Sequence, residues 1–476
     1  MADAVPNDKL RQYLRELTPE ARTLLAAELE RALLRGDDPP GASLILEELR
    51  SDARGTGRSM PPRLGNPQRL FFAPLEPFLV DDTPERKHRG RIARACLDPI
   101  WAWISRDLMP QEAKAYADQV AMLLAANEQK GADHVARAFQ DLAEQRMREI
   151  PAGARADIKA QRRIAAQIGT HHAIEDVREI SAILRVRDAL AVMAARLPAS
   201  IGNLADEQLD NARALLDSPI GRHRDVFLYG LLLVMNRLNA PWQLIRLSVQ
   251  AAGSDVAARI AETPFAVAVE IVLTDVERMT ATLRDNLKAG HSTEIAASIK
   301  DLHDAARALR TELDLSSDSP WSRQLSAARA EVSKLLQAEI ENLPAQVRRV
   351  LRPRTARETG SNATLDAGDV AEIETRLVLA ATCRNYAGEL AVSEATRRVH
   401  SELQNYFDTG TQVLIDRLRV SPPEERSFRQ SQVDAAIRFC AKMFGADYAS
   451  LLAKAADVAA KGEQKAARAE QKAAKA

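Results

Sequence analysis

Apolar residues recur at helical spacing along most of this chain. Near the N-terminus, Leu10, Leu14 and Leu17 are three or four positions apart, which places their side chains on one face of an α-helix. The Thr-Pro-Glu sequence at 18–20 then supplies an N-cap oxygen, a proline at the first helical position and an acid beside the positive helix end. A second apolar stripe follows. Residues 1–35 are therefore predicted to form a helical hairpin.

The next segment, 36–83, loses this period because it is rich in proline and glycine, and both residue types interrupt helices. We interpret 36–69 as a flexible linker. It leads into an apolar and aromatic stretch, 70–80, which two prolines are expected to keep out of helix. An apolar patch of this size is expected to be buried, either against the rest of the protein or against a partner. We favour a strap packed along the helical body over a docking segment for a partner. A docking segment would use Leu70, Phe71, Phe72, Leu75 and Phe78.

Residues 84–352 have the pattern of one central helical body with short breaks at glycines and prolines. Val226–Leu238 is apolar nearly all round, so it should be the most enclosed helix. Phe265–Lys288 and Thr293–Leu313 are separated only by a short turn at Gly290, and so short a connection makes consecutive helices antiparallel neighbours.

The remainder of the chain is predicted as a linker at 353–368, a C-terminal helical unit at 369–456 and an Ala/Lys/Glu tail at 457–476. The tail has no apolar face to bury and should fray. Neither a repeat of about 20–50 residues nor sustained heptads nor strand alternation is present. The sequence therefore predicts an all-α, non-repetitive multi-helix bundle with flexible linkers and a frayed C-terminal tail.

Composition narrows the class of protein. Basic and acidic residues number 66 each, hydrophobic residues make up 46% and aromatic residues 4%. These values fit a globular protein, disfavour a strongly basic nucleic-acid binder and disfavour an all-β fold. The first ten residues include acids and lack an apolar core, so we expect no secretory signal. The longest apolar run, Val226–Met235, is shorter than the roughly 20 residues of a membrane span, and we expect no transmembrane segment.

The three cysteines, Cys96, Cys383 and Cys440, are far apart and form no CxxC motif. This spacing supports neither a disulfide framework nor a zinc ribbon. We therefore expect a cytoplasmic protein.

One cluster of candidate metal ligands lies at His171, His172, Glu175 and Asp176. On a helix, the first His and Glu175 would be four residues apart, as would the second His and Asp176, and nitrogen and carboxylate donors suit a divalent cation. The two pairs would face about 100° apart, so a metal would need a further ligand from elsewhere. We favour a polar helix start with acids placed in the local dipole.

A second candidate is the adjacent pair His303 and Asp304, within the sequence Asp-Leu-His-Asp-Ala-Ala at 301–306. A His-Asp pair on an all-α scaffold resembles the HD-type metal phosphohydrolases, and the resemblance implies an upstream His and a downstream Asp as further ligands. His291 lies upstream, but much nearer than that family's pattern places it. Asp314 lies downstream without a surrounding motif. The resemblance covers almost nothing of the chain.

Other catalytic and cofactor motifs are absent from the sequence. It contains no GxSxG, no P-loop, no GxGxxG after a strand and no pair of ExxH motifs. We therefore predict a protein that is not an enzyme and that carries no cofactor.

Two basic clusters could bind phosphates of nucleic acid or of lipid headgroups. We favour a solvated surface paired to acids elsewhere, as is usual for charge runs, and the scarcity of interleaved aromatic residues disfavours RNA stacking. The residues are Arg86, Lys87, Arg89, Arg91 and Arg94, and then Arg348, Arg349, Arg352, Arg354 and Arg357.

These observations favour a non-catalytic cytoplasmic scaffold, adaptor or regulatory protein that acts through protein–protein binding. Its protein partner is not identified by the sequence, and self-association as a homo-oligomer is compatible with it. Two alternatives stay open: a metal-dependent phosphohydrolase of the HD type, and a binder of nucleic acid or anionic membranes through the arginine clusters.

Overall fold

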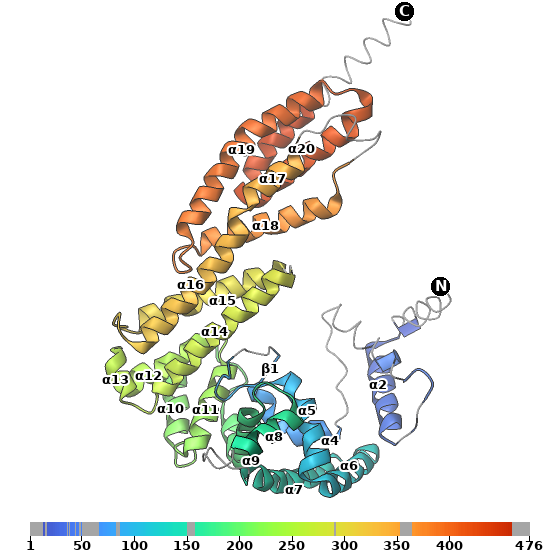
Figure 1. The fold of residues 1–476 in the computed structure, drawn as a ribbon, viewed down its shortest axis with the longest axis vertical. Coiled ribbons are helices and arrows are strands. Elements are labelled where there is room, and N and C mark those ends of the chain that lie inside the picture. The colour runs from blue at the N-terminus through green and yellow to red at the C-terminus, as the bar shows by residue number, and fades with distance from the viewer. Residues whose placement is uncertain are drawn as a thin grey trace, which may run out of the picture. The chain divides into compact units, whose positions relative to one another are not determined.

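The predicted all-α multi-helix fold is confirmed (Figure 1). The structure is a computed structural model, and within its described residues the sole regular sheet is a pair of two-residue strands. The predicted linker at 353–368 and tail at 457–476 lie largely outside the described residues, and so do Arg354, Arg357 and His291. The described residues are 13–14, 17–35, 37, 39–42, 44–46, 49, 66–81, 86–149, 158–289, 292–352 and 364–458.

The chain divides into two compact units. Unit 1 comprises Met1–Ile201 and Asp206–Arg237, and unit 2 comprises Gly202–Ala205 and Leu238–Ala476. The division falls inside the segment 84–352 that the sequence pattern suggests as one body.

Unit 1 is built mainly of helices, several of which begin at a proline because that residue fits the first helical position. Its helices are α2 (Pro19–Leu34), α4 (Pro67–Phe72), α5 (Leu97–Trp103), α6 (Pro110–Ala125), α7 (Gln129–Arg148), α8 (Ile158–Ile168), α9 (Ala173–Arg196), α10 (Asp206–Asp217) and α11 (Arg224–Arg237). Its shorter elements are the 3-10 helices η1 (Ala73–Phe78) and η2 (Arg94–Cys96), the π-helical turn η3 (Ile104–Leu108), and the parallel strands β1 (Leu79–Val80) and β2 (Ile92–Ala93).

Unit 2 begins with short helices and continues with long ones. Its elements are η5 (Pro241–Leu244), α12 (Ile245–Ala252), α13 (Ala257–Ala261), α14 (Ala266–Ala289), α15 (Ser292–Glu312), α16 (Pro320–Glu341), α17 (Leu343–Leu351), α18 (Ala367–Asn385), α19 (Ser393–Arg419) and α20 (Pro423–Phe444). Helices α14 and α15 lie side by side, as expected from the short turn between them (Figure 1). Within the described part of the chain, no helix is both long enough and apolar enough to cross a membrane.

The stretch predicted to stay out of helix is helical for most of its length. Asn66 caps α4 through its side-chain oxygen, which accepts the Arg69 backbone N–H at 2.7 Å, and Pro67 occupies the first position. The chain then tightens into the 3-10 helix η1, which contains Pro74 and Pro77. The expectation was wrong because Pro74 lies in the first turn of η1, where a proline costs no hydrogen bond, and because the 3-10 helix also accommodates Pro77 in its interior.

This α4–η1 segment, residues 67–78, lies in the core of unit 1. Phe71, Leu75 and Phe78 are at most 1% exposed. The Phe71 ring contacts Phe139 of α7 at a centroid distance of 5.4 Å, and the Phe78 ring contacts Tyr229 of α11 at 5.1 Å. The segment therefore ties α7 and α11 together, and α11 itself is buried throughout 228–235, as predicted for the most enclosed helix.

Candidate functional site

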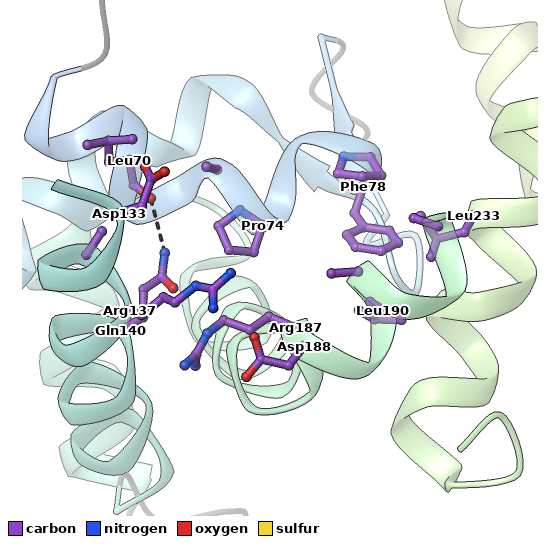
Figure 2. Close-up of a pocket in the computed structure, with 15 residues that line it drawn as sticks. Leu70, Pro74, Phe78, Asp133, Arg137, Gln140, Arg187, Asp188, Leu190 and Leu233 are labelled. Carbon is purple, nitrogen blue, oxygen red and sulfur yellow. Dashed lines mark hydrogen bonds between the residues drawn. The ribbon is translucent and has the colours of Figure 1, made fainter. Parts of the chain in front are cut away.

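A cavity of about 300 Å³ opens between the α4–η1 segment and helices α7, α9 and α11 of unit 1 (Figure 2). Its volume is at the lower end of the roughly 300–1,000 Å³ of small-molecule pockets. Its apolar wall includes Pro74, Phe78, Leu190 and Leu233. The other lining residues are Leu70, Ala73, Pro77, Asp133, Ala136, Arg137, Gln140, Arg187, Asp188, Ala191 and Ala194.

Gln140 of α7 holds the upper wall of this pocket in place. Its Nε2 donates to the carbonyl oxygens of Leu70 at 3.1 Å and of Phe71 at 3.0 Å. Pro74 has no N–H with which to continue the α-helical bonding pattern to Leu70. The Leu70 carbonyl accepts the Ala73 N–H instead, and the glutamine amide supplies a second donor to it.

The other half of the same amide has no partner. Gln140 is 3% exposed, and its Oε1 accepts no hydrogen bond from any residue that the structure describes. The two bonds donated by Nε2 fix the orientation of the amide, because a flipped amide would place an oxygen against two carbonyls. An unsatisfied buried acceptor costs about 1–3 kcal/mol, so this oxygen favours a donor brought by a ligand.

Arg187 of α9 adds a buried donor to the lining. Its Nη2 pairs with Asp141 at 2.7 Å, and its Nη1 donates to the Leu184 carbonyl at 2.9 Å. Its Nε is buried without an acceptor among the described residues. Figure 2 shows Arg187 reaching from α9, and Gln140 from α7, toward the space below Pro74.

Three exposed charged residues complete the rim of the pocket. Arg137 of α7 and Asp188 of α9 are both exposed, and neither forms an ion pair with any residue that the structure describes. The third charged rim residue, Asp133, accepts from Gln129 at 2.8 Å. A hydrogen bond from a neutral amide leaves the Asp133 carboxylate charged. The rim therefore offers one exposed cation, Arg137, and two exposed anions, Asp133 and Asp188, beside a buried acceptor and a buried donor.

Two larger cavities lack these features. One, of about 440 Å³, lies in unit 2 among α14, α15, α16 and α18. The other, of about 460 Å³, lies beside α10 in unit 1. None of the described residues that line them has a buried polar side-chain atom without a partner. The pocket beside Gln140 is therefore the better candidate.

A buried group of charges lies elsewhere in unit 1. The Lys87 Nζ is 2.7 Å from Asp176 Oδ1 and 2.8 Å from Glu179 Oε2, and it also donates to the Arg91 carbonyl. Gly90 N–H donates to the second oxygen of Glu179 at 2.7 Å. We call Lys87, Asp176 and Glu179 the Lys87 cluster. It fixes the segment before β2 to α9.

The protonation of these groups follows from their burial. Burial lowers the pKa of Lys87, but the two carboxylates outweigh it and hold that pKa above its usual value. Burial raises the pKa of Glu179 despite the nearby ammonium. Burial, together with the charge of Asp176, raises the pKa of the neighbouring Cys96 thiol to about 12. A thiol with so high a pKa is a poor nucleophile.

The backbone at Gly90 leaves no room for a side chain. Its φ is +77°, in the left-handed region, and a Cβ built there would lie 2.5 Å from Leu232 Cδ1. Only glycine adopts this φ without steric cost. The close approach places the Gly90 N–H against Glu179.

The residues proposed for partner docking lie inside unit 1. Leu75 is fully buried, Phe72 is 4% exposed, and Leu70 is partly buried in the pocket lining. With Phe71 and Phe78 also buried, these side chains offer no exposed apolar patch. This arrangement supports the intramolecular strap rather than the docking segment.

The first proposed metal cluster is not assembled. His171 and His172 precede α9 rather than belonging to it, and their rings contact each other at 4.6 Å. The Asp176 N–H donates to the His172 carbonyl at 2.8 Å, so this pair is one helical turn apart as expected, and Glu175 and Asp176 lie in the first turn of α9. Asp176 is engaged by Lys87. Across the described part of the chain, no three His, Cys, Asp or Glu residues are grouped so that they could hold a metal ion.

The second proposed cluster is a surface hydrogen-bonding arrangement. His303 Nδ1 lies 3.1 Å from Asp304 Oδ1, and Lys300 pairs with the same carboxylate at 2.8 Å. The His303 ring also packs on Tyr386 at 4.8 Å. Asp314 lies beyond the end of α15, eleven residues from His303 in sequence. Eleven residues of helix span roughly 16 Å, which is too far for a shared metal.

The first basic cluster is largely engaged within the protein. Lys87 is buried against two acids. Arg91 donates to Asn236 at 3.2 Å, and Arg94 pairs with Glu76 and Asp81, each at 3.1 Å. Arg86 and Arg89 are exposed.

The second basic cluster is partly engaged. Arg348 pairs with Glu402 at 2.5 Å and lies over the Tyr406 ring at 5.7 Å. Arg349 and Arg352 are exposed. Among the described residues of the two clusters, Lys87, Arg91, Arg94 and Arg348 are engaged by other residues of the protein, which supports paired charge at these four positions.

Sequence reasoning missed the pocket residues Arg137, Gln140, Arg187 and Asp188. One signal was available: Gln140 adjoins Phe139 on the buried face of α7, where Ala136 and Ala143 are also buried. A polar residue on an apolar helix face needs a hydrogen-bond partner. The partners themselves, about 70 residues away, could not be read from the pattern.

Comparison with known proteins adds no functional information. The chain matches no protein-family model, no curated protein and no solved structure. Its function therefore has to be argued from the geometry of its own residues.

Proposed function

We propose that this chain is a non-catalytic helical binding protein and that the pocket beside Gln140 is its site for a small molecule. The observation that carries the proposal is the unsatisfied Oε1 of Gln140, buried in a cavity wall that also holds the unsatisfied Nε of Arg187. Buried polar groups are normally satisfied. Two such atoms of opposite hydrogen-bonding character in one apolar pocket are typical of a site whose ligand supplies the missing partners.

The test measures binding of four small probes that share a branched apolar body but differ in charge. These are neutral 4-methylpentanamide, anionic 4-methylpentanoate, cationic 3-methylbutylamine and zwitterionic leucine, each titrated calorimetrically into the full chain. At least one should bind, and Ala191→Trp, which places an indole at the pocket mouth, should weaken that binding by about tenfold or more.

The matched control is Ala195→Trp. Ala195 is also exposed on α9 but does not line the pocket, so this substitution should leave binding unchanged. The proposal is refuted if no probe binds, or if Ala191→Trp binds every probe as the unmodified chain does.

Binding of a protein partner, the function expected from the sequence, stays a prediction. The most exposed large apolar side chains lie on separate elements, such as Leu24 of α2 at 71%, Met122 of α6 at 65% and Val420 after α19 at 79%. Single exposed apolar residues are normal on protein surfaces. They point to no particular docking face.

A further inference from the structure

We propose that the ligand of this pocket is an apolar zwitterion with the charges and size of an apolar amino acid. The inference rests on the proposed function, because it names the class of molecule that the pocket beside Gln140 would bind. The charges at the rim, the two buried polar atoms and the apolar wall each favour one part of such a molecule.

The rim charges define the polar end of the ligand. Arg137 and Asp133 come from α7 and Asp188 from α9, so one wall carries a cation together with an anion, and the facing wall carries an anion (Figure 2). None of the three is neutralised by an ion pair with the described remainder of the protein. A guanidinium favours a carboxylate, and a carboxylate favours an ammonium. One molecule carrying both groups satisfies both walls.

The buried atoms require the same two groups. Gln140 Oε1 lacks a donor and Arg187 Nε lacks an acceptor among the described residues. An ammonium donates to the first, and a carboxylate oxygen accepts from the second. Each pole of the zwitterion is thereby matched to one rim charge and one buried atom.

The remaining wall selects the ligand's side chain. Phe78, Leu190 and Leu233 are each at most 5% exposed and line the pocket together with Pro74. A cavity of about 300 Å³ leaves little space beyond a compact molecule. An aliphatic or aromatic side chain would bury its surface against this wall.

A ligand with a single charge fits less well. A carboxylate without an ammonium would be drawn to Arg137 but would approach the uncompensated charge of Asp188. An amine without a carboxylate would be drawn to Asp188, but its positive charge would approach the positive charge of Arg137. Like charges brought together at a partly desolvated site disfavour binding.

The experiment compares dissociation constants of leucine and phenylalanine with those of 4-methylpentanoate and 3-methylbutylamine, measured by calorimetry on the full chain. At least one amino acid should bind about tenfold or more tightly than either single-charge analogue. If an analogue binds as tightly as both amino acids, the inference is overturned while the pocket remains a binding site. If none of the compounds binds, both proposals fail.

Two variants test which rim residue binds the carboxylate of the ligand and which binds its ammonium. Arg137→Gln should weaken leucine and 4-methylpentanoate by about tenfold but not 3-methylbutylamine, and Asp188→Asn should weaken leucine and 3-methylbutylamine but not 4-methylpentanoate. A general loss across all ligands would contradict the assignment of poles and would indicate only a distorted pocket. Circular dichroism melts establish that each variant is folded.

The matched controls carry the same substitutions outside the pocket. Arg178→Gln changes an exposed arginine of α9, and Asp118→Asn changes an exposed aspartate of α6. Neither residue lines the cavity. Both variants should bind leucine as the unmodified chain does, and an equal loss in these controls would overturn the inference.

Discussion

Lys87 brings one positive charge into a buried space that already holds the carboxylates of Asp176 and Glu179. Its place in a run of basic residues favoured a solvated surface paired to acids elsewhere, with anion binding as the alternative, but the run does not show that the partner is Asp176, 89 positions away. Pairing between distant residues depends on how helices pack, which the local pattern does not encode. At this scale the sequence identified the charged residues but not their partners.

Replacing Lys87 should cost far more stability than replacing a surface cation. Lys87→Met leaves two carboxylates buried without their counter-charge, and breaking a buried pair in this way typically lowers the free energy of unfolding by about 3–5 kcal/mol. Arg94→Gln, which removes the exposed ion pairs with Glu76 and Asp81, should cost about 1 kcal/mol. Urea denaturation followed by circular dichroism measures both. Equal effects would show that the cluster contributes no more than a surface pair.

The stabilisation by Lys87 should also depend on pH. Its pKa in the folded protein lies above the ordinary 10.5. The folded state therefore holds the proton more tightly than the unfolded chain. The contribution is fully present below the unfolded pKa and is lost as the pH rises through the folded pKa. The difference in unfolding free energy between the unmodified chain and Lys87→Met should shrink above pH 10.5. A difference that stays constant across this range would contradict the raised pKa.

The α4–η1 segment depends on a hydrogen-bond donor, Gln140, that comes from a distant part of the sequence. The prolines of 67–78 mark a break in the helical pattern, yet Asn66 caps a helix, and Gln140 donates to the Leu70 and Phe71 carbonyls, the first of which also accepts the Ala73 N–H. Gln432 of α20 does the same for the Leu351 and Arg352 carbonyls at the end of α17, at 3.2 and 2.9 Å. The period of apolar residues predicted most long helices, but the donors Gln140 and Gln432 come from other helices and were not predictable.

Removing the Gln140 cap should loosen the segment that it holds. Gln140→Leu leaves the Leu70 carbonyl without its side-chain donor, and loss of a buried hydrogen-bond partner costs about 1–3 kcal/mol. Hydrogen exchange followed by mass spectrometry should show faster exchange across 67–80. Gln145→Leu, at an exposed position of the same helix, is the control and should leave that exchange unchanged. Equal exchange in the two variants would refute the capping role.

The whole molecule is all-α, as the helical period predicted, but its division into two units was not foreseen. The boundary between Arg237 and Leu238 lies near Pro241, and in the sequence that proline resembles the breaks at other helix ends. Each unit has its own buried side chains, including Phe71 in the first and Phe407 in the second. A unit with its own core can unfold as a separate transition.

Calorimetry of the full chain should therefore show two thermal transitions. Lys87→Met should lower the midpoint of one, and Phe407→Ala, which removes a fully buried ring at a cost of about 3–5 kcal/mol, should lower the midpoint of the other. If both substitutions shift the same single transition, the two units unfold as one cooperative body.

The geometry at Gly90 limits which amino acids can replace it during evolution. The left-handed backbone and the proximity of Leu232 admit no other amino acid without strain, while the amide there is a hydrogen-bond donor to Glu179. Any homologue of this chain that retains the lysine and its two acids should therefore also retain glycine at the position of Gly90. The combination of Lys87, Gly90, Asp176 and Glu179 can therefore be used to recognise homologous sequences whose overall identity to this chain is low.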